Sequence, residues 1–227
     1  MPLKTWNTKA DFDAAYNIGL EPDGYPNTRA EVRGGYERST LFNQNDSRLN
    51  LFTKEVGNIV NRFQWPLNTT ILIVGCGFGW AIEAYQALGY TNVWGADAST
   101  YIQSDKTLID SRTGIANSLI PTRIINNSLS TRTERRNLLR DTLGNVNNTF
   151  QVVITERVLS SLTDTEAQDI STKIRADILA ATGTLIHIEI NAIPGDDPTF
   201  NFKTLDAWKT LLPNDVIVDN GGGRILI

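Results

Sequence analysis

Residue types that form covalent cross-links and metal sites are scarce in this sequence. Its 227 residues include one cysteine, Cys76, and one histidine, His187. A single cysteine excludes a disulfide bond within the chain, and one thiol with one imidazole cannot build the cysteine- and histidine-rich sites that hold zinc or iron. We therefore expect no metal centre. His187 is flanked by isoleucines in a β-like segment and is predicted to be a hydrogen-bonded core or surface residue.

Long apolar runs are also absent. No uninterrupted apolar stretch reaches the about 18 residues that indicate a membrane-spanning helix, and the first residues lack a signal-peptide pattern. We therefore expect a soluble, cytoplasmic protein with no membrane partner.

The charge balance argues against a nucleic-acid-binding protein. Lysine and arginine number 21 against 25 aspartates and glutamates, and with a net charge of −4 an overall attraction to nucleic acid is not expected. The strongest local basic pattern is Arg132, Arg135, Arg136 and Arg140, whose spacing suits the solvated face of a helix. Nucleic acid is therefore not an expected partner, and the oligomeric state is left open.

The composition changes along the chain. Residues 1–47 are rich in asparagine, glycine, tyrosine and charge and contain several turn signals, which suggests an N-terminal extension or lid. Residues 48–227 form the main domain, and a sequence that is 41% hydrophobic is sufficient for one sizeable core. The domain begins with a helical pattern over residues 48–62, which Pro66 prevents from continuing.

From residue 70 onward, strands alternate with helices. Apolar runs predict strands at residues 71–74, 92–96, 122–125, 151–155, 183–190, 216–218 and 224–227. Helical patterns cover residues 80–88, 101–110, 131–143, 164–179 and 205–212, and Thr131 with Glu134 forms a capping box. Three glycines separate the last two strands, which indicates a hairpin. This order predicts an α/β fold with a doubly wound, mostly parallel, seven-stranded sheet and a C-terminal antiparallel hairpin strand.

A glycine loop follows the first buried strand. Residues 75–79 read Gly-Cys-Gly-Phe-Gly and lead directly into a helix. Glycine allows a sharp turn and lets a ligand approach the backbone, and ligands of open α/β sheets bind at the carboxyl ends of strands. A dinucleotide fingerprint would need a small residue where Trp80 stands, so a nicotinamide-dependent oxidoreductase is the least favoured alternative. A purely structural turn is the other interpretation of the loop.

Asp97 ends the second predicted strand. A carboxylate at this place can accept hydrogen bonds from both hydroxyls of a ribose. The alternative role is an N-cap of the following helix, where aspartate is also favoured.

The fourth predicted strand completes a family pattern. It runs through Thr155 and Glu156 into a Val-Leu-x-x-Leu turn over residues 158–162. With the glycine loop, Asp97 and the terminal hairpin, residues 71–227 resemble the class I S-adenosylmethionine-dependent methyltransferases. The chain departs from that family at Ile73, where members often have an acid, and at Ser160.

The resemblance implies a cofactor, S-adenosylmethionine, and a set of site residues. In the family the loop lies beside the amino-acid part of the cofactor, the strand-four end faces its methionine part, and a polar residue after strand three meets the adenine. The implied cofactor-binding residues are Gly75, Cys76, Gly77, Phe78, Gly79, Asp97, Ala98, Asn127, Thr155 and Arg33. Candidate catalytic residues are Glu156, whose alternative role is an ion pair with a nearby arginine, and Tyr36. Glu189 and Asn191 are expected to line a cleft.

The resemblance also bears on the methyl acceptor. No proline follows the fourth strand, as amino-directed nucleic-acid methyltransferases need, and no cysteine stands there for a cytosine-C5 enzyme. A small molecule or a protein is therefore the expected acceptor. The alternative is a non-catalytic structural or assembly protein that retains the methyltransferase fold.

Overall fold

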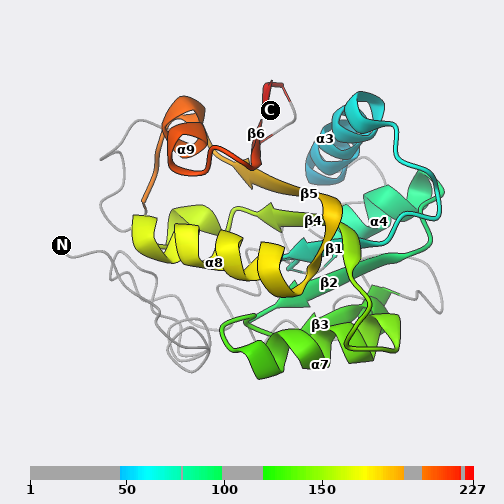
Figure 1. Ribbon diagram of the computed structural model, residues 1–227. Helices are drawn as coiled ribbons and strands as arrows, with labels where there is room; N and C mark the ends of the chain where they lie inside the picture. Colours follow the sequence, from blue (N-terminus) through cyan, green and yellow to red (C-terminus); the bar gives the residue numbers. More distant parts are fainter. Residues whose placement is uncertain (1–46, 78, 99–119, 192–200, 221–222) are drawn as a thin grey trace, which may run out of the picture.

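A computed structural model describes residues 47–77, 79–98, 120–191, 201–220 and 223–227 of the chain. A seven-stranded sheet crosses it in the order β3-β2-β1-β4-β5-β6-β7 (Figure 1). The strands from β1 to β6 are parallel, and β7 is antiparallel to β6. Their bounds are Ile71–Val74, Val93–Asp97, Ile124–Asn126, Phe150–Glu156, Leu179–Glu189, Val216–Asp219 and Ile225–Leu226. The predicted fold class is confirmed.

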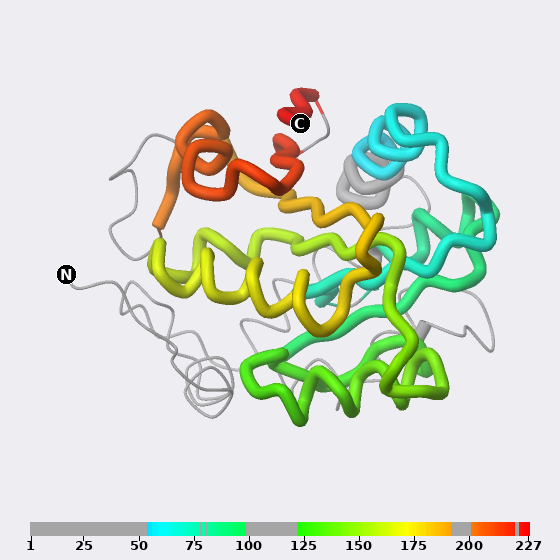
Figure 2. The backbone as a smooth tube through the Cα atoms, in the orientation of Figure 1, coloured from blue at the N-terminus to red at the C-terminus, as the bar shows by residue number. Residues whose placement is uncertain are grey.

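Helices cover both faces of the sheet (Figures 1 and 2). One face carries α3 (Ser47–Phe63) and α4 (Trp80–Ala87), whose buried side chains share a core with β1 and β4. The other carries α7 (Arg132–Leu143), α8 (Asp164–Asp177) and α9 (Leu205–Leu211). The short 3₁₀-helices are η1 (Ile120–Arg123) and η2 (Leu159–Ser161). Because each face has its own helical layer, the strands at the centre are buried on both sides.

The register brings three strand ends to one edge of the sheet. Val74 at the end of β1 pairs with Ala96 in β2 on one side and with Thr155 in β4 on the other. The chain runs outward in opposite directions from β1 and β4, so the topology switches between these strands. Ligands of such sheets bind at the carboxyl ends of the strands at this point.

Two strand boundaries differ from the sequence prediction. The strand predicted at residues 122–125 is β3 at Ile124–Asn126, because η1 occupies residues 120–123. The strand predicted from residue 183 begins at Leu179, immediately after α8.

The pairing of β4 with β5 is irregular near its start. Phe150 pairs with Leu179 but Val152 pairs with Thr184, so the register shifts between these two pairs. Gly183 lies in the shift, where an added Cβ would come within 2.8 Å of the Gln151 carbonyl oxygen. Only glycine fits this irregular strand without displacement.

The predicted solvated arginine face is wrong at one position. Arg135 is buried, and its guanidinium donates to the carbonyl oxygens of Leu129 and Ser130 at 2.8 and 3.1 Å. It also donates through Nε to Asp177 at the end of α8, at 2.9 Å, and forms an ion pair there at 2.7 Å through Nη2. Arg136, by contrast, is exposed. Arg135 thus connects α7 to α8. Helix periodicity does not predict this contact, because Arg135 and Asp177 are far apart in the sequence.

His187 lies at the centre of a buried polar chain, as the prediction of a hydrogen-bonded core residue requires. Its Nδ1 lies 2.7 Å from the hydroxyl of Thr155, and its Nε2 lies 2.9 Å from Asp215 Oδ2. Ser171 and Arg175 of α8 also donate to the Asp215 carboxylate. These hydrogen bonds therefore link β4 through β5 to α8. They satisfy the polar atoms of His187 and Asp215, as buried polar groups require.

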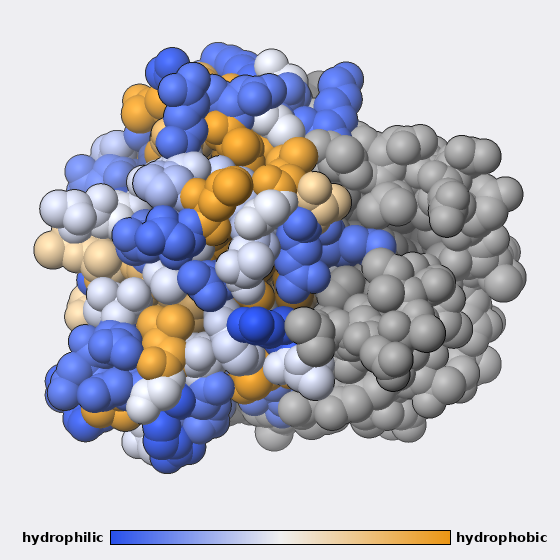
Figure 3. All heavy atoms as spheres, turned by 90° about the vertical axis from the view of Figure 1, so that its right-hand side faces the viewer, coloured by the Kyte–Doolittle hydropathy of each residue, from blue (hydrophilic) through white to orange (hydrophobic). Residues whose placement is uncertain are grey.

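The surface of the described part is mixed in polarity. No described helix is long and apolar enough to cross a membrane. On the side that carries α3 and α4, apolar side chains lie scattered among polar ones (Figure 3). Exposed large apolar residues of the described part are Leu67, Leu88, Ile190 and Ile227.

Replacing Arg135 tests the buried tie between α7 and α8. Arg135→Met replaces the aliphatic part of the arginine with an apolar chain but removes the guanidinium. Asp177 and two carbonyl oxygens then lose this donor, so the free energy of unfolding should fall by about 2–4 kcal/mol. Arg136→Met, the same change at the exposed neighbour, should alter it by no more than about 0.5 kcal/mol. Urea denaturation measures both, and similar losses in the two variants would contradict the assignment.

Acid should weaken the fold through Asp215. Burial alone would raise the pKa of this carboxyl, but its interactions with His187 and the hydrogen bonds from Ser171 and Arg175 outweigh burial and lower the pKa. A depressed pKa gives stability that is present above the unfolded value of about 4 and is lost as the pH falls through the lower folded value. Asp215→Asn should therefore lower the free energy of unfolding at about pH 7 by roughly 2 kcal/mol, and less at about pH 3. Urea denaturation at both pH values checks this, and an equal difference at both would refute it.

Candidate functional site

The glycine loop is built on left-handed backbone conformations. Gly75, Gly77 and Gly79 have φ angles of 72°, 51° and 83°, a region that other residues rarely adopt. Gly75 has a second reason to lack a side chain: an added Cβ would lie 2.6 Å from Val158 Cγ2 and 3.0 Å from the carbonyl oxygen of Glu156. The loop thus packs directly against the end of β4, and this fit accounts for the first glycine.

Asp97 holds the loop in place. It ends β2, is only 7% exposed, and its Oδ2 accepts a hydrogen bond from the backbone amide of Gly77 at 3.0 Å. The loop backbone is also anchored to β2 by the hydrogen bond from the Gly75 amide to the Ala96 carbonyl at 2.8 Å. The two features that the sequence singled out separately are therefore one structural unit.

Cys76 has its side chain on the core side of the loop. The thiol packs against β2, where a Cβ on Gly95 would come within 2.5 Å of its sulfur. Burial, followed by the nearby charges of Asp97 and Glu156, raises the pKa of the Cys76 thiol well above its usual value. A buried thiol of this kind is unreactive, so Cys76 can serve a ligand only through its backbone.

The end of β3 is closed by asparagine side chains. Asn127 is buried and donates to the carbonyl oxygen of Glu134 at 2.9 Å, while its Oδ1 accepts from the amide of Leu129 at 2.8 Å. Its amide group thus shapes the turn into α7, and its role at an adenine stays a prediction. The preceding Asn126, which the sequence did not single out, donates to the carbonyl oxygens of Asp97 and Ala98, both at 3.2 Å.

The end of β4 places two predicted residues on opposite faces of the sheet. Thr155 is fully buried and its hydroxyl is bonded to His187, so only its backbone faces the edge of the sheet. Glu156 is 8% exposed, and its Oε1 lies 3.8 Å from Nη2 of Arg157. Burial raises the pKa of Glu156 to about 8; Arg157 opposes the rise, and Glu55 and Asp97 add to it. At neutral pH this carboxyl therefore carries a proton.

Arg157 and Glu189 lie at the carboxyl ends of β4 and β5. Arg157 has a left-handed backbone (φ 53°), which costs energy in a residue with a side chain. Its amide donates to the carbonyl oxygen of Ile188, and its Nη2 donates to Asn220 Oδ1 at 2.7 Å. Glu189 is fully buried and accepts from the amide of Leu159 at 2.8 Å; burial, the largest influence, raises its pKa to about 7. It lies inside the sheet edge rather than along an open cleft.

Asn191 also has a structural role. It is exposed, and its Oδ1 accepts from the amide of Leu205 at the start of α9 at 3.2 Å. The predicted site residues Arg33, Tyr36 and Phe78 lie outside the described residues, so their roles stay predictions.

Glu55 is a residue of the site that the sequence analysis missed. It belongs to α3, is only 1% exposed, and lies close enough to Glu156 to raise the pKa of that carboxyl. A signal for it was present: Glu55 stands on the apolar side of the helix, three residues after Phe52 and four before Ile59. A charged residue in an apolar stripe is an unusual feature that needs a reason.

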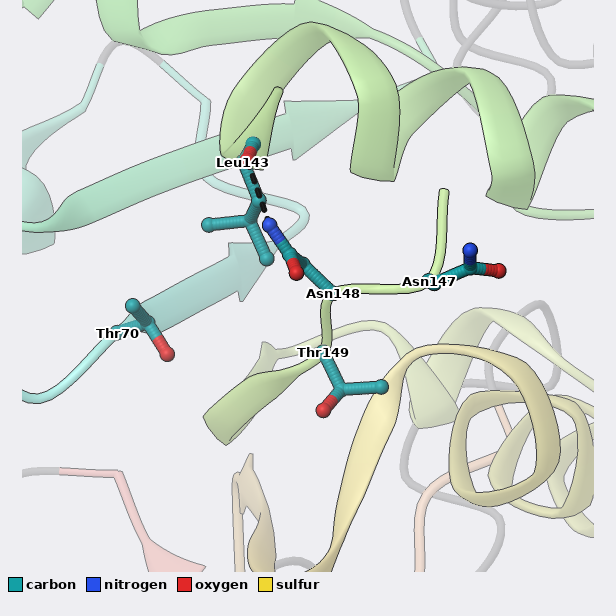
Figure 4. Close-up of a pocket in the computed structure, with 5 residues that line it drawn as sticks. All are labelled: Thr70, Leu143, Asn147, Asn148 and Thr149. Carbon is teal, nitrogen blue, oxygen red and sulfur yellow. Dashed lines mark hydrogen bonds between the residues drawn. The ribbon is translucent and has the colours of Figure 1, made fainter. Parts of the chain in front are cut away.

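One described hollow lies at the opposite edge of the sheet. It measures about 480 Å³ and is lined by Thr70, Leu143, Asn147, Asn148 and Thr149 (Figure 4). Asn148 donates to the carbonyl oxygen of Leu143 at 2.9 Å across it. Because Thr70 and Thr149 precede β1 and β4, this hollow lies at the amino ends of the strands, away from the glycine loop.

Comparison with known proteins locates the fold. No family model matches the chain, and no curated protein matches it. Solved structures do match: mitomycin 7-O-methyltransferase MmcR is similar over 84% of this chain, with a TM-score of 0.52 and 11% identity, and the chain spans 53% of that protein. Glycopeptide N-methyltransferase MtfA with S-adenosyl-L-homocysteine gives a TM-score of 0.51 and 14% identity over 76% of this chain and 84% of that one.

A third similar structure is the plantazolicin methyltransferase BpumL in complex with S-adenosylhomocysteine. Its TM-score is 0.50 at 13% identity, over 90% of this chain and 75% of that one. At such identities the likeness is one of architecture, and it agrees with the strand order. The chain has the fold of the class I S-adenosylmethionine-dependent methyltransferases.

Proposed function

We propose that this protein binds S-adenosylmethionine and transfers its methyl group to a small-molecule or protein acceptor. The observation that carries the proposal is the hydrogen bond from the Gly77 amide to Asp97 Oδ2, at 3.0 Å. It joins a glycine-rich backbone turn to an acid at the end of the next strand. A turn of this kind admits the amino-acid part of the cofactor, and the acid can accept hydrogen bonds from its ribose.

The residues present fit such a cofactor. Three left-handed glycines leave three positions of the loop without a side chain, and the loop follows a strand end at the topological switch point, where ligands of this architecture bind. Bound there, the sulfonium supplies the methyl group. The chain then needs mainly to align donor and acceptor, because transfer from a sulfonium is an in-line displacement.

Among the described residues, Glu156 is the candidate proton acceptor, a role that it can take once its carboxyl group has ionised. An acceptor that reacts through an N–H or O–H group must lose a proton, and a base is most useful when its pKa lies near the working pH. The pKa of Glu156, about 8, is in that range. Tyr36 stays a second candidate and Arg33 a candidate partner of the methionine carboxylate.

The similar structures support this proposal and leave the acceptor open. MmcR, MtfA and BpumL are named for methylating mitomycin, a glycopeptide and plantazolicin. MtfA and BpumL hold S-adenosylhomocysteine, the product form of the cofactor. We infer the cofactor from these bound ligands and from the glycine loop. We also infer an acceptor of similar kind, either a small molecule or a peptide.

Titration with S-adenosylhomocysteine tests the proposal. Calorimetry should detect binding to the wild type, and Asp97→Asn should weaken it about tenfold or more, because a neutral amide is a poorer acceptor for ribose hydroxyls. The amide oxygen can still accept from Gly77, so the loop should survive.

The matched control is Asp141→Asn, the same change at an exposed residue of α7 that pairs with Arg140. It should bind like the wild type. If the wild type gives no binding heat with about 1 mM ligand, the proposed function is wrong.

A further inference from the structure

Glu156 stands at the meeting point of the glycine loop and the α3–α4 layer. It is the last residue of β4, and its carbonyl oxygen lies against Gly75. Side chains alternate along a strand, so Glu156 points to the same face as Val152 and Ile154. Those two belong to the core shared with α3 and α4 (Figure 1). The carboxyl group is therefore held beneath the loop, away from solvent.

Two further carboxyl groups act on Glu156. Those of Glu55 on α3 and Asp97 on β2 both raise its pKa, and the guanidinium of Arg157 opposes them. Arg157 is 3.8 Å away and is shared with Asn220. The thiol of Cys76 and the phenol of Tyr85 also lie within electrostatic reach, and neither supplies a positive charge. Such a cluster favours an arriving cation.

A second observation comes from Tyr85 on α4. Its side chain is 1% exposed, and its hydroxyl has no hydrogen-bond partner within the described part of the chain. The carboxyls of Glu55 and Glu156 are both near enough to act on this phenol. A buried hydroxyl without a partner is costly, so its position beside the two acids points to a group that the chain itself does not supply.

We propose that Glu156 is the counter-charge of the methyl donor: its carboxylate ionises when the sulfonium binds and is neutral when the thioether product is bound, so the site selects donor over product. The proposal rests on the proposed function, because the bound cofactor is the cation that Glu156 meets.

The protons released and taken up by Glu156 balance over one round of binding and methyl transfer. Because burial raises the pKa of Glu156 to about 8, the group is protonated near neutral pH and releases one proton to solvent when the sulfonium binds. Methyl transfer forms a bond between the methyl carbon and the acceptor nitrogen or oxygen, breaks the carbon–sulfur bond, and leaves the electron pair on sulfur as a neutral thioether. The proton of an N–H or O–H acceptor then passes to the Glu156 carboxylate. The site keeps the same net charge throughout, so the neutral product leaves a neutral carboxyl group behind.

The ratio of two dissociation constants isolates this role. S-adenosylmethionine and S-adenosylhomocysteine differ only in the methyl group and its positive charge, so every other contact cancels when their affinities are compared. At about pH 8.5 the wild type should prefer S-adenosylmethionine at least about tenfold more than Glu156→Gln does, which corresponds to one pKa unit. Glutamine mimics the protonated carboxyl, so this variant should still fold and bind S-adenosylhomocysteine.

The pH dependence and the proton count give independent readouts. As the pH rises from about 6.5 to about 8.5, Glu156 ionises without help, and the preference of the wild type for S-adenosylmethionine should increase. Calorimetry at about pH 7 in buffers of different ionisation enthalpy should show close to one proton released on binding S-adenosylmethionine and almost none with S-adenosylhomocysteine. Glu156→Gln should release none with either ligand.

Glu166→Gln is the matched control. Glu166 belongs to the capping box of α8, where glutamine can replace glutamate, so this variant should keep the ratio and the proton release of the wild type. An equal ratio in the wild type and Glu156→Gln, or equal proton release with both ligands, overturns the counter-charge assignment while the proposed function stands. Failure of the wild type to bind either ligand overturns both.

Discussion

The hydrogen bond between the Gly77 amide and the Asp97 carboxylate is the contact on which the site depends. It can form because β1 and β2 are parallel neighbours in register, so the loop after one strand meets the last residue of the other. The left-handed glycines allow the loop to bend far enough to reach the acid. Register and backbone freedom are both needed, and neither alone would place the acid under the loop.

Charge is distributed unevenly along this edge of the sheet. Asp97 and Glu156 end β2 and β4, and Glu55 approaches from α3, so three carboxyl groups are gathered where water is excluded. Burial, the largest influence, raises the pKa of Glu156 to about 8, so this carboxyl holds a proton at neutral pH. A similar cluster on the surface would be ionised and screened, and its response to a ligand would be weak.

The opposite face of the sheet is stabilised in a different way. Asp215 and Arg135 each pair with charged or polar groups from distant segments, and His187 joins Asp215 to the hydroxyl of Thr155. Because Asp215 and Arg135 both have partners, these contacts hold α7 and α8 on this face, while Glu55, Asp97 and Glu156 are gathered on the other. Thr155 and Glu156 are adjacent in sequence but belong to these two different environments, since successive residues of a strand point in opposite directions.

Local patterns were sufficient to predict the alternation of strands and helices, the glycine loop, Asp97 at a strand end, the capping box at Thr131 and Glu134, and hence the fold class. These features depend on backbone preferences and on apolar periodicity within a few residues, which a single sequence displays. The capping box is observed at the start of α7, and the boundaries of most elements lie within two residues of the prediction.

Which polar residues are buried together depends on tertiary packing, and local patterns did not predict it. Arg135 looked like a member of a solvated face and meets Asp177, 42 positions away. Glu55 acts on Glu156 across a much longer separation, and Asn127 has a contact in the turn into α7 that the sequence did not predict. The early start of β5 also follows from a register shift against β4. Such contacts depend on how helices pack on the sheet, and local sequence patterns carry no information about distances between segments that are far apart in the chain.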